Sequence, residues 1–273
     1  MPAPPSRTAR HGGPDLVGDG TDYSAVVSGL ISQAVGTFTN VSSGITERGL
    51  PGGSGSQTAN AFSLQINSQF ISGDPACSRA GNPSICQAWQ QFVYTFNNSH
   101  SGEIFMQYWL INFDATCPSG WFTFQSDCFT NSNASTVSVV TAAQLATLSL
   151  TGTAVSGGND SVSLVVGTGH ATSVTNADTK ISLASFWNTT EWGVYGDGGG
   201  SEANFGANTT LEAQTVLTAT NNAAPTCVQE GFTGETNNLT LTTTPALGTE
   251  PTPTIGTRQT NGTPGTASCA TAG

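Results

Sequence analysis

Apolar and polar residues alternate with a period of two along much of the chain, beginning near residue 60. In the segment 62–67, Phe62, Leu64 and Ile66 alternate with polar residues. Such alternation predicts β-strands that bury one face, and Gly, Asn, Asp or Pro bounds most of these segments. The further strands expected are 86–96, 103–113, 145–154, 160–167, 181–186, 190–196, 209–220 and 237–243.

Helical periodicity is weak by comparison. Residues 140–148 are the best candidate for a short helix, whereas residues 23–36 fit either a helix or a strand. Many strands without intervening helices indicate antiparallel sheets, so the predicted fold is an all-β antiparallel β-sandwich. We expect a flexible Pro-, Gly- and Asp-rich leader over 1–22, a single sandwich domain over 23–243, and a Thr/Pro/Gly-rich tail over 244–273.

Three of the predicted strands (86–96, 103–113 and 190–196) share an unusual pattern. One face of each carries apolar residues typical of a core, and the other mixes amides, one carboxylate and large aromatic rings. A solvated face would carry Thr, Ser and Lys, so the pattern predicts a cleft on a concave sheet. The alternative is that both faces are buried. The candidates for substrate binding in the cleft are Trp89, Gln91, Phe105, Gln107, Trp109 and Tyr195.

Six cysteines stand in two close pairs and one distant pair. None has the Cys-x-x-Cys spacing of a zinc or thioredoxin site, and an even count in a Thr/Ser/Asn/Gly-rich chain predicts disulfides. Disulfides indicate an oxidising compartment, so we expect a secreted, extracellular protein. Sequence proximity assigns the two close pairs, although the sequence alone does not determine connectivity. The predicted bridges are Cys77–Cys86, Cys117–Cys128 and Cys227–Cys269.

Charge and histidine content argue against several classes of function. The net charge is −11 with six Lys and Arg, so nucleic acid and anionic membranes are not expected partners, because phosphate binding needs clustered cations. The three His show no metal-binding spacing, and we expect no metal or cofactor. Glycosylation sequons, which would add surface glycans in a eukaryotic source, begin at Asn40, Asn97, Asn133, Asn159, Asn188, Asn208, Asn238 and Asn261.

Two parts of the chain resemble a known family. Residues 86–94 read Cys-Gln-Ala-Trp-Gln-Gln-Phe-Val-Tyr, and residues 103–109 read Glu-Ile-Phe-Met-Gln-Tyr-Trp. Residues 190–195, Thr-Glu-Trp-Gly-Val-Tyr, precede a Gly-rich loop and an Ala-Asn-Phe-Gly step at 203–206. These segments are similar to the catalytic strands of the eqolisins, the glutamic peptidases. The resemblance implies a concanavalin-like jelly roll, an acidic pH optimum, no metal, and Gln87 and Glu191 as the catalytic pair.

In such a pair Glu191 would act as a general base that takes a proton from water and returns it to the leaving amine. The Gln87 amide would stabilise the oxyanion, a role typically worth ~10²–10³ in rate. We therefore expect a monomeric, secreted, acid-acting endopeptidase whose substrate is a polypeptide. Two alternatives stay open. A glycan-cleaving enzyme would pair Glu191 with Glu103 or Asp197, and a glycan-binding module or cell-surface structural protein would stack its aromatic rings on a ligand.

Overall fold

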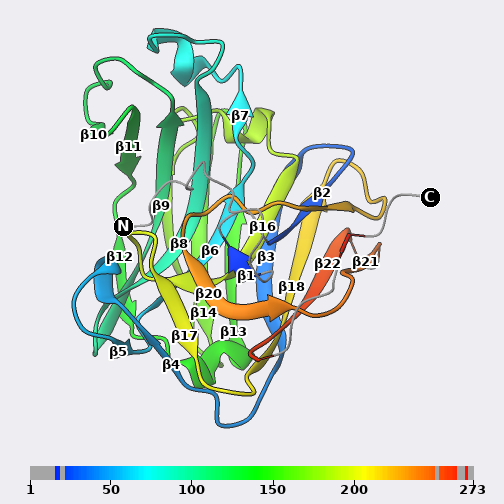
Figure 1. Cartoon of the computed structure of the whole chain (residues 1–273). Coiled ribbons are helices and arrows are strands. Elements are labelled where there is room, and N and C mark those ends of the chain that lie inside the picture. The colour runs from blue at the N-terminus through cyan, green and yellow to red at the C-terminus, as the bar shows by residue number, and fades with distance from the viewer. Residues whose placement is uncertain (1–15, 19–21, 250–251, 263–267, 270–273) are drawn as a thin grey trace.

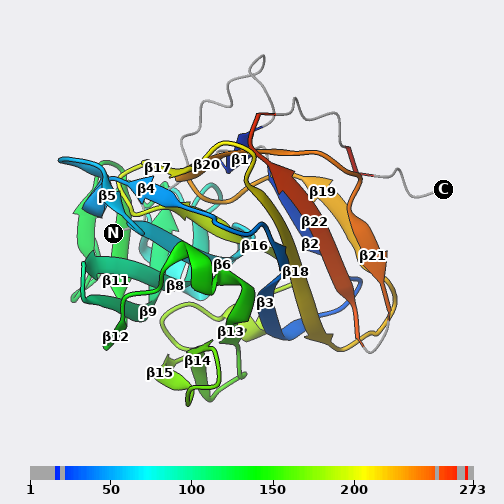
Figure 2. The same ribbon diagram turned by 90° about the horizontal axis from the view of Figure 1, so that it is seen from below.

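The computed structural model describes residues 16–18, 22–249, 252–262 and 268–269. Within these ranges the protein is built mainly from strands in two large sheets, which lie against each other in Figures 1 and 2. The predicted all-β antiparallel sandwich is thereby confirmed. In the same ranges, no helix is both long and apolar enough to cross a membrane.

The larger sheet has twelve strands among the described residues. In spatial order they are β15 (Thr172–Ala177), β14 (Asn159–Val166), β13 (Leu148–Thr153), β3 (Ile31–Val41), β18 (Thr210–Ala219), β22 (Thr254–Thr260), β20 (Thr236–Leu241), β17 (Glu202–Phe205), β4 (Glu47–Gly49) and β5 (Thr58–Ala59). Off this path, β1 (Leu16–Gly18) pairs with β20, and β21 (Ala246–Gly248) pairs with β22. Strands β17 and β20 run parallel, and the neighbours that surround them are antiparallel.

The smaller sheet has ten strands in the described part of the chain. In spatial order they are β10 (Phe122–Phe124), β11 (Asp127–Asn131), β9 (Ser101–Ile111), β8 (Gln87–Asn98), β6 (Phe62–Ser68), β16 (Thr189–Gly196), β2 (Tyr23–Val26) and β19 (Thr226–Gln229). Off this path, β12 (Ser135–Ser138) pairs with β9, and β7 (Ile71–Ser72) pairs with β8. The central strands β9, β8 and β16 carry the predicted site residues, and β6 lies between β8 and β16.

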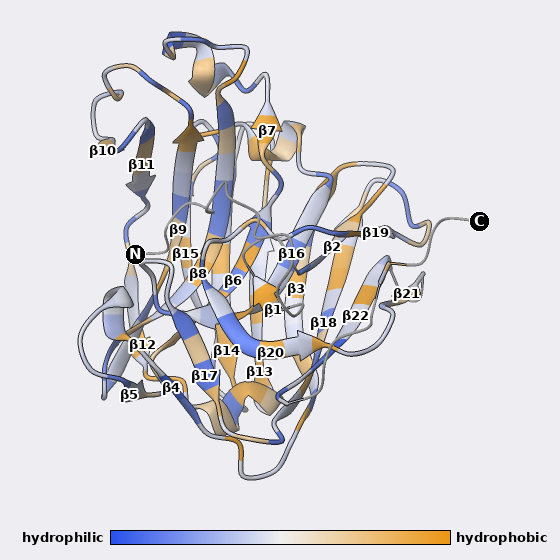
Figure 3. Ribbon diagram, viewed as in Figure 1, coloured by the Kyte–Doolittle hydropathy of each residue, from blue (hydrophilic) through white to orange (hydrophobic). Residues whose placement is uncertain are grey.

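The core between the sheets explains the alternation in the sequence. Strand parity sends Ile66, Phe92 and Trp192 into it, and their fractional exposure is 4% or less. Figure 3 shows the resulting bands of apolar residues along the strands. Glycines on the opposite sheet make room for the rings: a Cβ at Gly36 would lie 2.2 Å from Trp192, and one at Gly152 would lie 2.4 Å from Phe92. Missing side chains in one layer therefore admit large ones from the other.

In three short segments the structure either differs from the prediction or decides between the alternatives that the sequence left open. The strand predicted at 181–186 is wrong, because Leu183–Ser185 forms a 3₁₀ helix there, η4. The helix candidate at 140–148 is a 3₁₀ helix, η3 (Ala142–Thr147), begun by a capping box between Thr141 and Gln144 and followed directly by β13. Residues 23–36 form β2 and the start of β3. Two further 3₁₀ helices are η1 (Pro51–Gly53) and η2 (Pro75–Arg79).

Residues on both sides of the expected sandwich domain, 23–243, also belong to the fold. Most of the leader predicted at 1–22 lies outside the described residues, but Val17 in β1 and Asp22 are buried. The tail predicted from residue 244 supplies β21 and β22, and β22 lies between β18 and β20 inside the larger sheet. Its Thr-rich sequence gives little apolar alternation because only Ile255 and Gln259 of that strand are buried.

All three predicted disulfides are present. The Cα–Cα distances are 5.7 Å for Cys77–Cys86, 5.7 Å for Cys117–Cys128 and 5.6 Å for Cys227–Cys269. The third bridge joins β19 to the C-terminal segment and closes a separation of 42 residues.

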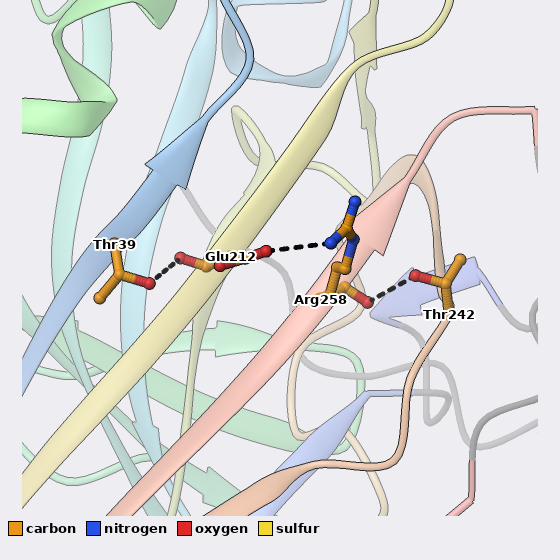
Figure 4. Close-up of polar contacts among 4 residues, drawn as sticks. All are labelled: Thr39, Glu212, Thr242 and Arg258. Carbon is orange, nitrogen blue, oxygen red and sulfur yellow. Dashed lines mark hydrogen bonds and ion pairs between the residues drawn. The ribbon is translucent and has the colours of Figure 1, made fainter.

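Charged contacts contribute little to this fold. Among the described residues there is one ion pair, between Arg258 Nη1 on β22 and Glu212 Oε1 on β18, at 3.2 Å (Figure 4). The backbone carbonyls of the same two residues accept hydrogen bonds from Thr242 and Thr39. The pair is 47% and 33% exposed, so its contribution to stability is roughly 0–1 kcal/mol.

Candidate active site

A row of polar side chains crosses the smaller sheet from β16 to β11. The strand registers place Glu191 opposite Asn67, Asn67 opposite Gln91, Gln91 opposite Gln107, and Gln107 opposite Asn131. Because residues directly opposite each other project from the same face, this polar row is fixed by the registers of four strand pairs. Its face is the second face predicted from the sequence, the one that looks away from the main core.

Hydrogen bonds join the members of the polar row. Asn67 Nδ2 donates to Glu191 Oε2 at 2.8 Å, and Gln91 Nε2 donates to Asn67 Oδ1 at 3.1 Å. Gln91 Nε2 also donates to Gln65 Oε1 at 2.8 Å, and Gln107 Nε2 donates to Asn131 Oδ1 at 2.9 Å. The amides therefore hold one another in fixed orientations around the single carboxylate.

Glu191 is fully buried at one end of this network. Its Oε2 accepts a second hydrogen bond from the backbone N–H of Phe232 at 3.0 Å. Its Oε1 is buried and makes no hydrogen bond to any residue that the structure describes. Burial raises the pKa of Glu191 well above its usual value, and the negative charge of Asp22 raises it further, against the opposing effect of the Asn67 and Phe232 N–H donors and of the Tyr195 hydroxyl. The carboxyl is thus set up to hold a proton.

Asp22 and Tyr195 lie beside Glu191. Tyr195 Oη donates to Asp22 Oδ2 at 2.6 Å, and the Tyr23 N–H donates to Asp22 Oδ1 at 2.8 Å. Burial raises the pKa of Asp22 to about 6, although the Tyr195 and Tyr23 hydrogen bonds and the Glu191 carboxyl favour its ionised form. Two carboxyls and a phenol are therefore gathered in one dry location.

An aromatic cluster covers the polar row. It consists of Trp89, Trp109, Ile111, Phe129 and Phe232, with Phe70 packed against it. The rings of Phe70 and Phe232 are 5.6 Å apart, and those of Phe70 and Trp89 are 5.5 Å apart. The indole N–H groups are also used: Trp89 donates to the Ser68 carbonyl and Trp109 donates to Gln107 Oε1, both at 2.9 Å.

The predicted open cleft is consequently closed in this structure. Trp89, Gln91, Gln107 and Tyr195 have no exposed surface, and Trp109 and Phe105 are 2% and 5% exposed. The alternative expectation, that both faces are buried, describes the structure correctly. The face is closed by a segment that is distant in the sequence. The segment Glu230–Glu235, here called the covering segment, leads from β19 into β20, and Asn237 on β20 donates to the Val194 carbonyl of β16 at 2.8 Å.

The structure does not bring Gln87 to Glu191. Gln87 lies at the start of β8, opposite Ile111, and its amide is 3.3 Å from Ser72 Oγ. Gln91, four residues further along, is the glutamine of β8 that lies in the polar row, so Gln87 is displaced by about 13 Å along the strand. The amide in direct contact with Glu191 is that of Asn67.

The carboxylates named in the glycan-cleaving alternative are not beside Glu191 either. Asp197 follows Glu191 by six residues, about 20 Å along a strand. Its oxygens accept hydrogen bonds from Thr95 Oγ1 and from the N–H groups of Phe96 and Gly52, which is a structural role. Glu103 pairs with Thr95, four residues along β8 from Gln91.

Two pockets lie near the covered row. One of 410 Å³ is lined by Asn131, the last residue of the row, together with Phe105, Glu103 and Asp197. Another of 350 Å³ is lined by Phe232 of the covering segment. Gln87 lines this second pocket, which is where the structure places that predicted catalytic residue.

Sequence reasoning missed three residues of this arrangement. Asn67 is one of the polar residues that alternate with apolar ones in its strand. That alternation, combined with the order of the strands, would have identified it. Asp22 fell at the boundary of the predicted leader, and Phe232 belongs to a segment without strand signals; no pattern in the sequence relates either to Glu191. No cluster of three or more His, Cys, Asp or Glu suited to a metal occurs among the described residues.

Comparison with solved structures finds two crystal structures of scytalido-glutamic peptidase, one with a peptide-based transition-state analogue and one with a transition-state analogue inhibitor. The first is 12% identical, with a TM-score of 0.33, over 87% of this chain and 97% of that chain. The second is 14% identical, with a TM-score of 0.29, over 85% and 98%. No protein-family model and no curated protein matches the chain. Because both TM-scores are low, the function proposed below rests on this chain's own residues.

Proposed function

We propose that this protein is a secreted endopeptidase in which Glu191 moves the protons of the reaction. The observation that carries the proposal is the state of its carboxyl: buried, held through Oε2 by Asn67 and the Phe232 N–H, and free at Oε1 of hydrogen bonds to described residues. A buried carboxyl with a strongly shifted pKa in a polar, preorganised location is typical of an acid–base group. The three disulfides support secretion.

The proposed peptide hydrolysis needs an ionised Glu191 and one hydrogen-bond donor for the oxyanion. Glu191 Oε1 takes a proton from water as the water oxygen bonds to the substrate carbonyl carbon, whose oxygen becomes an oxyanion. The proton then passes from Glu191 to the leaving nitrogen as the C–N bond breaks. Among described residues, Asn67 Nδ2 donates only to Glu191, so one of its two N–H bonds remains for the oxyanion. Such a donor is worth roughly 10²–10³ in rate.

Gln91 takes a different role in this proposal. Both N–H bonds of its amide are donated, to Gln65 and Asn67. Its Oε1 is buried and accepts no hydrogen bond from a described residue. An N–H of an extended polypeptide would satisfy that oxygen, which would align the substrate backbone across the polar row. Gln91 is therefore proposed as a substrate-positioning residue, and the two flanking pockets as subsites.

Access requires the covering segment to move. The N–H of Phe232 occupies Glu191 Oε2, and the Phe232 ring packs on the aromatic cluster above the row. When the segment withdraws, water reaches Glu191, and the loss of desolvation lowers its pKa so that it can ionise as a base. Acid conditions suit the protein for a separate reason, because burial raises the pKa of most of its buried carboxyls and their protonated forms are favoured in the fold.

The test is cleavage of an acid-denatured protein across the acidic range, with pepstatin and a metal chelator present. Cleavage should persist with both inhibitors and vanish in Glu191→Gln, while the control variant Glu212→Gln, which changes a carboxylate on the other sheet, should retain it. Absence of cleavage at every acidic pH would overturn the proposal. Glycan binding without cleavage would instead favour the concanavalin-like glycan-binding alternative.

A further inference from the structure

A second carboxyl belongs to the site of Glu191. Ser24 on β2 lies opposite Glu191 on β16, and Asp22, which comes just before β2, accepts a hydrogen bond from Tyr195 of β16. Asp22 is 1% exposed and Glu191 has no exposed surface. The two carboxyls thus meet in the same dry region, although they are 169 positions apart in the chain.

The hydrogen bonds of the two carboxyls are unequal. Both oxygens of Asp22 accept a hydrogen bond: Oδ2 from Tyr195 Oη at 2.6 Å and Oδ1 from the Tyr23 N–H at 2.8 Å. Glu191 receives both of its donors on Oε2, and its Oε1 has no hydrogen-bond partner among described residues. Donors to both oxygens favour the ionised form, so Asp22 is the better place for negative charge and Glu191 the better place for a proton.

The surrounding elements supply no positive side chain in the described ranges. Asn67 faces Glu191 from β6, and Tyr195 faces it from β16 itself. The covering segment contributes the Phe232 N–H, the exposed Glu230, and Glu235, whose Oε2 accepts from Thr233. The one ion pair of the described chain, Arg258–Glu212, is on the other sheet. Two buried carboxyls that no described positive side chain faces cannot both ionise at modest cost.

We propose that Asp22 is a positioning residue that acts through Glu191: the two carboxyls hold a single proton, which the negative charge of Asp22 keeps on Glu191. Tyr195 fixes Asp22 for this role through its hydrogen bond. The inference rests on the proposed function, in which Glu191 gives its proton to the leaving nitrogen. It adds the group that sets how firmly the proton is held, and it gives the pair a net charge of −1.

The direction of the pKa shifts agrees with this geometry. Burial raises the pKa of Asp22 to about 6, whereas burial and then the charge of Asp22 raise the pKa of Glu191 well above its usual value. As the pH rises through about 6, Asp22 loses its proton first and Glu191 retains its own. With the covering segment in place, the singly protonated pair therefore exists above that pH and is replaced by two neutral carboxyls below it.

The test is an NMR titration of the side-chain carboxyl carbons in protein labelled with ¹³C at Glu and Asp, assigned with the Glu191→Gln and Asp22→Asn variants. In Asp22→Asn the titration midpoint of Glu191 should fall by a unit or more, a tenfold or greater change in proton affinity. In Tyr195→Phe the midpoint of Asp22 should rise, because a donor to its ionised form is lost. The control is Glu212→Gln, which removes one carboxylate on the other sheet and should move neither midpoint.

An unchanged Glu191 midpoint in folded Asp22→Asn overturns the proposal. If that variant fails to fold, as judged by circular dichroism, an unchanged Asp22 midpoint in Tyr195→Phe overturns it instead. The titration does not depend on enzymatic activity, so the carboxyl pair and the peptidase function can be contradicted independently of each other. Shifted midpoints in a protein that cleaves nothing would leave the carboxyl pair standing and remove the peptidase. Cleavage with an unchanged pH–rate profile in Asp22→Asn would leave the peptidase standing and remove the carboxyl pair.

Discussion

Asn67 and Glu191 face each other across β6 and β16, with the Asn67 amide donating to Glu191 Oε2 at 2.8 Å. In the proposed mechanism this contact makes Asn67 the oxyanion donor in place of Gln87, which is about 13 Å along β8 from the polar row. We expect Asn67→Ala to lower kcat by roughly 10²–10³ with little change in KM, because an oxyanion donor acts mainly in the transition state.

The matched control for that variant is Gln87→Ala, which removes an amide from the same sheet face at the edge of the 350 Å³ pocket. It should affect KM more than kcat if the pocket binds substrate. Steady-state kinetics on one peptide substrate separates the two. A large loss of kcat in Gln87→Ala with a small loss in Asn67→Ala would restore the pair that the family resemblance implies.

Removal of the Phe232 ring should loosen the covering segment. The ring is 3% exposed and packs edge-on against Phe70, so Phe232→Ala should destabilise the fold by up to about 3–5 kcal/mol. Hydrogen exchange at the backbone N–H of residue 232, which is bonded to Glu191, should accelerate more than exchange in β3. Phe122→Ala, which removes a ring that is 64% exposed, serves as the control and should change neither. Unchanged exchange in Phe232→Ala would show that the ring does not hold the segment down.

Stability should fall as the pH rises from about 4 to 8. Burial raises the pKa of Asp160 to about 7 and that of Glu47 to about 8, both above the value of about 4 expected in the unfolded chain. The folded protein therefore binds more protons than the unfolded one in this window, and its free energy of unfolding decreases with pH. Urea unfolding at pH 5 and pH 8 measures the difference.

Asp160→Asn isolates one part of that pH dependence. Asp160 Oδ2 accepts from Gln90 Nε2 at 3.0 Å, and an Asn can keep that acceptor without titrating. The variant should lose less stability than the wild type between pH 5 and 8. A wild-type protein that is more stable at pH 8 than at pH 5 would contradict the sign worked out here.

The bridges should differ in their contribution to stability according to the length of chain that they close. The separation is 42 residues for Cys227–Cys269 and 9 for Cys77–Cys86. On the chain-entropy account the first is worth about 4 kcal/mol and the second about 2.6 kcal/mol. Denaturant unfolding of the two double Cys→Ala variants measures the ranking. The opposite order would mean that native-state contacts near η2, rather than chain entropy, dominate.

The sequence by itself determined the local structure and the layer to which each strand face belongs. Alternation in 62–67, 86–96 and 103–113 required strands with one apolar face, and the structure buries Phe62, Phe92 and Met106 in the core accordingly. The short spacing of four cysteines was enough to pair them correctly. These features depend on neighbours in the chain, so a one-dimensional pattern contains them.

Only the tertiary structure decided which polar residues meet. Strand order and register across β16, β6 and β8 chose Asn67 as the partner of Glu191, and a shift of two residues in one register would have chosen another amide. Asp22 and Phe232 reach Glu191 from segments without periodicity, through contacts that span 169 and 41 positions. The same long-range packing closed a face that local parity described as a cleft, because parity specifies which side chains share a face but not what lies over it.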